Sequence, residues 1–136
     1  MKRCMLMLML LLILAAPVLC GCGASEENAD TYLQITAEEA AKIMAEETDY
    51  ILLDVRTEEE YATEHIPGAI CIPNEAIGDS APAELPDKDQ RILIYCRSGN
   101  RSKDAAEKLV RLGYTRIIEF GGINDWNGET VSGEEE

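Results

Sequence analysis

The sequence predicts an α/β domain with a mostly parallel central sheet of about five strands and helices on both faces. Short apolar stretches rich in β-branched residues alternate along the chain with segments whose apolar residues repeat at helical spacing. Two of the apolar stretches, residues 50–55 and 92–95, are nearly uninterrupted, as is usual for parallel strands that are buried on both faces. Alternation of this kind indicates parallel strands that are joined by crossover helices.

The elements follow in order from residue 32. Strands are predicted at residues 32–35, 50–55, 69–72, 92–95 and 116–120. Helices are predicted at residues 37–46, in a short segment after Thr57, at residues 102–112 and in a short segment that carries Trp126. The first two helices each begin with a capping box, in which a threonine (Thr36 or Thr57) precedes a glutamate by three residues. Gly113 is expected to end the third helix, and residues 73–90 are expected to form a loop with one or two helical turns.

The domain of residues 32–128 is flanked by segments of different composition. Residues 1–22 have a basic start and a short apolar run, which is typical of a secretory signal peptide and too short to span a membrane comfortably. They end in Leu19-Cys20-Gly21-Cys22, which resembles a bacterial lipobox. We favour cleavage before Cys22 over Cys20, and lipidation of Cys22 over a plain secretory signal. Residues 23–31 are expected to form a tether, and residues 129–136 an acidic tail that frays.

These end segments and the charge of the chain define its expected location and partners. An exported protein held at a membrane through lipid on Cys22 would face the outside of the cytoplasm. The formal net charge is −14, and removal of the signal makes the remaining chain more negative. This charge disfavours binding to nucleic acid and electrostatic adhesion to anionic lipid. No cofactor is expected, and no metal, because one histidine and two cysteines in the domain do not have the spacing of a zinc site.

The most informative segment of the chain links the strand at residues 92–95 to the helix that follows it. The strand leads into Cys96, and a loop with Gly99 and two arginines, Arg97 and Arg101, comes next. The backbone N–H groups at a helix N-terminus favour a bound anion. A thiol in that position ionises more easily, and the thiolate is the nucleophile. The residues therefore predict a cysteine nucleophile inside an anion-binding loop.

This loop resembles the active-site loop of the rhodanese-like sulfurtransferases, whose six residues correspond to Cys96–Arg101. Two further matches are Leu53-Asp54-Val55-Arg56 with Glu60-Tyr61 and residues 65–73, which are similar to the first signature of that family, and Gly121-Gly122-Ile123 with Trp126, which is similar to its C-terminal signature. The matches run in the family's order from about residue 32 to residue 127. The resemblance implies a single three-layer domain of the rhodanese-like fold.

The resemblance also implies a sulfurtransferase that moves a sulfane sulfur from thiosulfate or a persulfide to a thiol or cyanide. Cys96 would carry the sulfur as a persulfide, which splits the reaction into two steps. Arg101 is expected to act beside it by holding the loop or pairing with a carboxylate. The residues expected to bind substrate are Arg97, Ser98, Gly99, Asn100 and Ser102. The implied partners are a small anionic donor and a small-molecule or protein thiol acceptor, and the protein is expected to be a monomer.

Four other residues have more than one interpretation. By resemblance, Asp54 and Arg56 lie near the loop and shape it; a buried salt bridge that fixes the end of the sheet is equally open, and a pairing of Asp54 with Arg101 would serve both. By resemblance, His65 is at a family position that orders the turn before the third strand; it is not interpreted as a general base, because a persulfide mechanism needs no separate base. Cys71 is interpreted as a small buried residue. It would be able to pair with Cys96 if their strands were neighbours.

Two other functions compete with sulfur transfer. Phosphatases and arsenate reductases of the same fold have one more residue between the cysteine and the arginine of the loop. Here four residues separate Cys96 from Arg101, and the smaller loop favours a sulfur atom over a tetrahedral oxyanion. The second alternative is a non-enzymatic redox or binding module, which the complete loop disfavours.

Overall fold

The computed structural model describes residues 31–133, which form one parallel sheet with helices on both faces. The strands are β1 (Leu33–Gln34), β2 (Ile51–Asp54), β3 (Ala69–Cys71), β4 (Ile92–Cys96) and β5 (Ile117–Gly122). They lie in the order β1-β5-β4-β2-β3, and every neighbouring pair is parallel. The predicted α/β fold is confirmed. The predicted signal segment with Cys22, and all but the last residue of the tether, lie outside the described residues.

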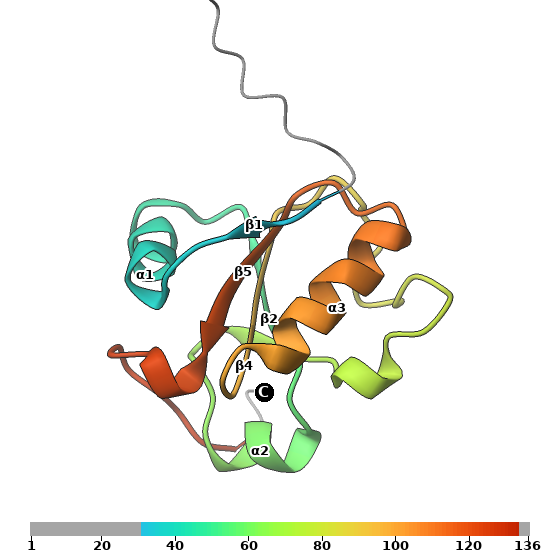
Figure 1. Ribbon diagram of the computed structural model, residues 1–136. Coiled ribbons are helices and arrows are strands. Elements are labelled where there is room, and N and C mark those ends of the chain that lie inside the picture. The colour runs from blue at the N-terminus through green and yellow to red at the C-terminus, as the bar shows by residue number, and fades with distance from the viewer. Residues whose placement is uncertain (1–30, 134–136) are drawn as a thin grey trace, which may run out of the picture.

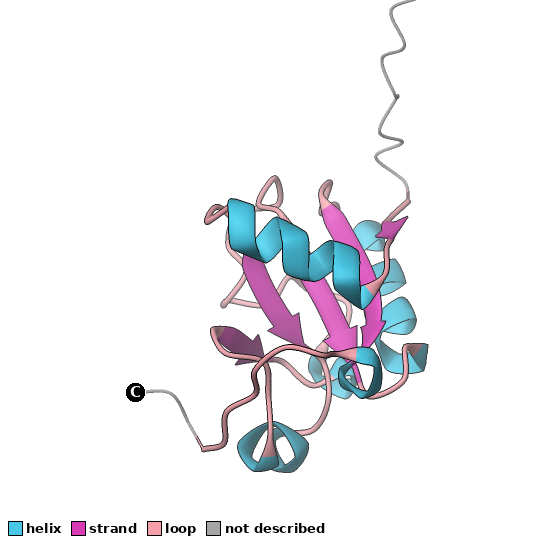
Figure 2. Ribbon diagram, turned by 90° about the vertical axis from the view of Figure 1, so that its left-hand side faces the viewer, coloured by secondary structure: helices cyan, strands magenta, loops and turns pink. Residues whose placement is uncertain are grey.

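Helices cover both faces of the sheet and its carboxyl edge. They are α1 (Ala37–Glu46), α2 (Glu58–Thr63) and α3 (Asn100–Arg111), with single turns η1 (Asn74–Ala76) and η2 (Ile123–Asp125). Figures 1 and 2 show α1 and α3 on opposite faces of the sheet, and α2 beyond the ends toward which the strands point. Both predicted capping boxes are formed, so the starts of α1 and α2 are set by local sequence. No helix within the described range is long and apolar enough to cross a membrane.

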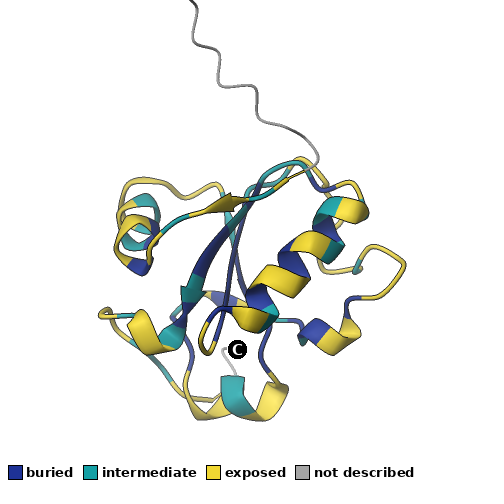
Figure 3. Cartoon of the chain, viewed as in Figure 1, coloured by how far each residue is buried: buried dark blue, intermediate teal, exposed yellow. Residues whose placement is uncertain are grey.

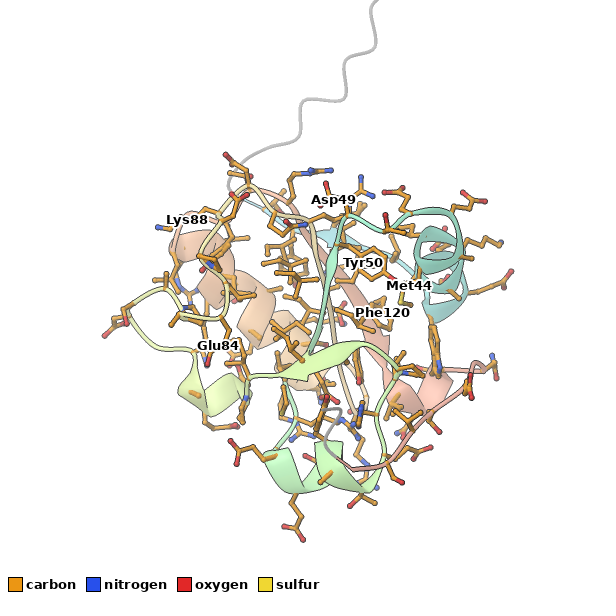
Figure 4. The ribbon with its side chains drawn as sticks, turned by 180° about the vertical axis from the view of Figure 1, so that it is seen from behind. Met44, Asp49, Tyr50, Glu84, Lys88 and Phe120 are labelled. Carbon is orange, nitrogen blue, oxygen red and sulfur yellow. The ribbon has the colours of Figure 1, made fainter. Side chains whose placement is uncertain are left out.

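The core has two halves, one on each face of the sheet. Along β4, Ile94 and Cys96 belong to the half under α3, and Leu93 and Tyr95 belong to the half under α1. Figure 3 shows β4 buried along its length and α3 with its buried residues turned toward the sheet. Figure 4 shows side chains of the half of the core under α1, among them Met44, Tyr50 and Phe120. A central strand buried on both faces holds the residue at its carboxyl end rigidly.

Most predicted bounds agree with the structure to within one residue, and larger differences occur at three places. Helix α3 begins at Asn100, two residues before the predicted start. Strand β5 continues through both glycines to Gly122, with an irregular register where it meets the end of β4. Residues 129–133, expected to fray, are held against α2: Val131 and His65 form an antiparallel bridge, and the N–H of Gly133 donates to the carbonyl of Ala62 at 2.8 Å. Backbone hydrogen bonds to a distant segment, which composition does not predict, order this tail.

Candidate active site

Cys96 is the last residue of β4, the middle strand of the sheet, and its side chain is buried. The chain then turns sharply and enters α3, beside the carboxyl ends of the strands (Figure 1). Gly99 makes this turn possible because its φ of 106° lies in the left-handed region, which favours glycine. The result places the sulfur of Cys96 at the N-terminus of a helix of 12 residues.

The sulfur of Cys96 makes two hydrogen bonds within the loop and the start of α3. The backbone N–H of Gly99 donates to Sγ at 3.0 Å, and the thiol donates to the hydroxyl oxygen of Ser102 at 3.5 Å. Burial raises the pKa of Cys96, but hydrogen bonding with the side chain and backbone of Ser102 and with the backbone of Gly99 and Ser98 outweighs it, so the net pKa is lowered. These are the interactions that stabilise a thiolate, as predicted for a nucleophile in this loop.

The end of β5 packs directly against the loop. The N–H of Asn124 donates to the carbonyl of Arg97 at 3.2 Å, which ties the loop to the turn after β5. A Cβ atom at Gly122 would lie 2.0 Å from that carbonyl oxygen and 2.6 Å from the nitrogen of Ser98. The close approach therefore requires glycine at position 122, and it explains why a Gly-Gly pair ends this strand.

Glu119 lies beneath the loop. It was not among the site residues predicted from the sequence. Glu119 is 2% exposed, and its Oε1 accepts hydrogen bonds from the hydroxyl of Ser102 at 2.5 Å and from the N–H of Gly121 at 2.8 Å. Ser102 thus joins Glu119 to Cys96. The signal in the sequence is a lone acidic residue inside the apolar strand of residues 116–120, where a buried charge needs hydrogen-bonding partners.

The two arginines of the loop have different surroundings. Arg101 forms a bidentate ion pair with Glu60 of α2, at 2.8 Å and 3.0 Å. The expected carboxylate partner of Arg101 exists, but it is Glu60 and not Asp54. Arg97 is exposed, and its side chain has no hydrogen-bond or ion-pair partner among residues 31–133. Ser98 and Asn100 are also exposed, so the loop presents one free positive charge at its outer side.

Asp54 and Arg56 form a buried ion pair at the carboxyl end of β2. The guanidinium of Arg56 donates to both carboxylate oxygens of Asp54, the shortest contact being 2.6 Å, and also to the carbonyl of Glu64 at 2.6 Å. The guanidinium lies 5.7 Å from the ring centre of Tyr95, the residue before Cys96. The pair therefore supports the strand end that carries Cys96 and forms no hydrogen bond with its sulfur, whose partners are Gly99 and Ser102. This favours the interpretation as a salt bridge that fixes the sheet.

Cys71 and Cys96 do not lie on neighbouring strands, because β2 separates β3 from β4. Two strand spacings amount to about 9.6 Å between backbones, beyond the reach of a disulfide. Both cysteines are free thiols. Burial and the charge of Asp54 raise the pKa of Cys71 to about 11, so this thiol is a poor nucleophile. A pairing of Cys71 with Cys96 is therefore not supported by this topology.

His65 lies on the α2 side of the domain and forms no hydrogen bond with Cys96. Its Nδ1 is 2.8 Å from the carbonyl oxygen of Tyr61, and its ring stacks on that of Tyr61 with 3.7 Å between centres. Its backbone pairs with Val131. These contacts agree with a role in ordering the turn. No group of side chains that would hold a metal ion occurs within the described part of the chain.

The pairing of Arg101 with Glu60 makes a prediction about acid stability. The Arg101 guanidinium lowers the pKa of Glu60 from 4.5 to about 2, and the N–H of Thr57 adds to this. A depressed carboxyl pKa contributes stability that is complete above 4.5 and lost as the pH falls toward 2. We expect Glu60→Gln to lower the free energy of unfolding at pH 7 by about 1 kcal/mol and to flatten its decline in acid.

Urea unfolding at pH 7 and at about pH 3 measures both effects. Glu84→Gln is the matched control, because the Glu84 side chain is exposed and forms no hydrogen bond or ion pair with residues 31–133; it should follow the native protein at both pH values. If Glu60→Gln loses as much stability in acid as the native protein does, the ion pair is not a source of acid lability.

A cysteine with a lowered pKa, at the end of the middle strand of a parallel sheet and at the start of a helix, has the arrangement of enzymes that use a cysteine nucleophile. Within that class, the family model for the rhodanese-like domain matches residues 36–129. The chain belongs to the rhodanese-like domain family, and its relatives class it as a rhodanese-type sulfurtransferase.

Three relatives illustrate this. Thiosulfate sulfurtransferase PspE of Escherichia coli is 38% identical over 73 residues, which cover 54% of this chain and 70% of PspE. A sulfurtransferase of Allochromatium vinosum is 38% identical and covers 68% of this chain and 86% of its own length. A solved structure described as a rhodanese with anions from E. coli superposes with a TM-score of 0.57 at 36% identity, over 62% of this chain and 99% of that one. Other curated relatives are longer: this chain spans 27% of the length of one of them and 57% of the length of another.

Proposed function

We propose that this protein transfers a sulfane sulfur from a small anionic donor to a thiol or cyanide through a persulfide on Cys96. The observation that carries the proposal is the buried sulfur of Cys96, which accepts the Gly99 N–H at 3.0 Å at the start of α3. Preorganised N–H donors stabilise an anion without having to move, whether the anion is a thiolate or the terminal sulfur of a persulfide.

The two steps balance in atoms and charge. The Cys96 thiolate attacks the outer sulfur of thiosulfate; a new S–S bond forms, the donor S–S bond breaks, and sulfite leaves with its electron pair. Cyanide or a thiolate then attacks the outer sulfur of the persulfide and leaves as thiocyanate or a new persulfide, which returns Cys96 as a thiolate. Each step needs an unprotonated sulfur at Cys96, and the hydrogen bonds that lower the pKa of Cys96 supply it.

The charges around the loop support an anionic donor of small size. Arg97 is the exposed cation beside Cys96, whereas the charge of Arg101 is compensated by Glu60. The relative PspE is named a thiosulfate sulfurtransferase, and thiosulfate is therefore the donor that we propose to test first. A low-molecular-weight or protein persulfide is the second donor class, with a small-molecule or protein thiol as the acceptor.

The phosphatase alternative is less well supported. Four residues separate Cys96 from Arg101, and the turn between them is occupied by the contact of Gly99 N–H with the sulfur. A loop of this size favours one sulfur atom over a phosphoryl group. Hydrolysis of an aryl phosphate by the native protein, lost in Cys96→Ser, would favour the alternative.

Mass spectrometry of the reduced protein after incubation with thiosulfate tests the proposal. The expected result is a single added sulfur on the peptide that contains Cys96, removed by cyanide with release of thiocyanate. The peptide that contains Cys71 should carry no sulfur, because its thiol has a pKa of about 11. A reduced protein that takes up no sulfur from either thiosulfate or a small persulfide would overturn the proposal.

We also propose that the protein is exported and anchored through lipid on Cys22. The support is the pattern of residues 1–22 alone, and these lie outside the described residues. The intact mass of the protein extracted from membranes checks it. A mature N-terminus at Cys22 with the added mass of a diacylglyceryl group is expected, and a mature form without that mass would contradict lipidation.

A further inference from the structure

Ser102 stands between two groups that compete for its one hydroxyl proton. Its Oγ lies 2.5 Å from Oε1 of Glu119 and 3.5 Å from Sγ of Cys96. The carbonyl oxygens of Gly99 and Gly121, at 3.0 Å and 3.2 Å, are the other polar neighbours of this hydroxyl. A serine hydroxyl has a single proton to donate, and every neighbour except a protonated thiol is an acceptor.

The carboxylate of Glu119 is the strongest of these acceptors. A charge-assisted hydrogen bond of 2.5 Å is short, and Glu119 has no lysine or arginine partner within the described residues. Ser102 is fully buried, so water does not compete for its hydroxyl. When Ser102 donates to Glu119, it presents a lone pair to Cys96. That orientation accepts a hydrogen bond from an S–H group and opposes negative charge on Sγ.

We propose that Glu119, acting through Ser102, disfavours negative charge on Sγ of Cys96 and thereby favours the Cys96 persulfide over the free thiolate. In the persulfide, Sγ is neutral and the negative charge sits on the outer sulfur, one S–S bond of about 2.0 Å further away. Ser102 and Glu119 are buried, whereas the loop residues Arg97 and Ser98 are exposed, so an outer sulfur is expected on the side of the loop N–H groups. Glu119 is a positioning residue in this account, because it reaches Cys96 only through Ser102.

The other titratable groups near Glu119 do not replace it in this role. Tyr32, before β1, has a raised pKa because it is buried and because the charges of Glu107 and Glu119 are close. Glu107 lies on the exposed part of α3. The Oδ2 atom of Asp125 would lie 3.9 Å from a Cβ atom placed at Gly121. Glu119 is the one of these that hydrogen-bonds to Ser102. The backbone N–H groups of the loop lower the pKa of Cys96, and Glu119, by holding the Ser102 hydroxyl proton, limits what that hydroxyl adds to the effect.

The ionisation of Cys96 is measured by its rate of alkylation with iodoacetamide as a function of pH, read from the Cys96 peptide by mass spectrometry. Glu119→Gln keeps an acceptor oxygen for Ser102 and Gly121 but removes the charge that holds the hydroxyl proton. We expect the midpoint of the profile to move down by about half a pH unit to one unit, the equivalent of one competing hydrogen bond. Glu107→Gln, which removes the same charge from the outer side of α3, should leave the midpoint unchanged.

Ser102→Ala tests the route of the effect. In that background the additional Glu119→Gln change should move the midpoint by less than half as much, since the bridge is absent. An unchanged or raised midpoint in Glu119→Gln overturns the inference. An equally large shift with and without Ser102 also overturns it, because the charge would then act directly on the sulfur.

The persulfide half of the inference rests on the proposed function and has its own measurement. At a fixed ratio of thiosulfate to sulfite, and at a pH above both midpoints, the ratio of persulfide to thiolate at Cys96 should be several-fold lower in Glu119→Gln than in the native protein. An equal or higher ratio overturns this half. If the native protein takes up no sulfur at all, the proposed function fails, while the alkylation profile still decides the ionisation half.

Discussion

Replacing Cys96 by serine is expected to reduce thiocyanate formation from thiosulfate and cyanide by at least about 10³-fold. A serine hydroxyl at this position does not ionise near neutral pH, and its oxygen cannot carry a sulfane sulfur as a persulfide does. The buried setting should tolerate the change, because the hydroxyl can accept the Gly99 N–H that Sγ accepts now. Thermal unfolding of the variant checks that the loss of activity is chemical and not structural.

Cys71→Ser is the matched control for this prediction. Cys71 lies on β3, two strands away from Cys96, and its thiol has a pKa of about 11. We expect Cys71→Ser to keep activity within about twofold of the native protein. Activity that survives in Cys96→Ser, or that disappears in Cys71→Ser with the fold intact, would show that the wrong sulfur has been identified as the nucleophile.

Gly122→Ala is expected to have the second largest effect, on stability and on activity together. The new Cβ atom would lie 2.0 Å from the carbonyl oxygen of Arg97 and 2.3 Å from its carbonyl carbon. Both are backbone atoms, so the loop itself has to move. Overpacking of this kind costs about 1–3 kcal/mol or more of folding free energy. A displacement of about 1 Å of the Gly99 N–H from Sγ should lower the rate by about 100-fold.

Gly78→Ala provides the control for the effect of adding a methyl group. A Cβ at Gly78 meets no atom within 4 Å, and its φ is not in the left-handed region. This variant should unfold in urea at nearly the native midpoint and keep its activity. If Gly122→Ala also matches the native protein in both measurements, the close approach of β5 to the loop does not hold the loop in place.

Most of the fold followed from local patterns in the sequence. The buried strands β2 and β4 are continuous apolar runs, and the starts of α1 and α2 are capping boxes that the structure reproduces. The sequence predicted less well where an element begins or ends when that point depends on contacts with distant parts of the chain. The tail of residues 129–133 is ordered by backbone hydrogen bonds to His65 and Ala62, far away in the chain.

The candidate site divides in the same way. Cys96, Gly99 and the helix that follows them form one continuous segment, so their geometry is local and the spacing of residues predicts it. The partner of Arg101 is Glu60, 41 residues away in the sequence. The carboxylates of Glu60 and Asp54 both have the chemistry to pair with an arginine. Only the position of α2 at the carboxyl edge of the sheet decides between Glu60 and Asp54, because Asp54 is already paired with Arg56.

By itself, the sequence determined that this chain is a parallel α/β domain with a cysteine at a helix N-terminus, because hydrophobic periodicity and loop spacing are properties of neighbouring residues. The tertiary structure alone decided which distant side chains meet that cysteine. Glu119 reaches Ser102 since β5 lies beside β4, and Cys71 stays apart from Cys96 since β2 lies between their strands. Strand order is a long-range property, and it sets the charges and hydrogen bonds around the sulfur.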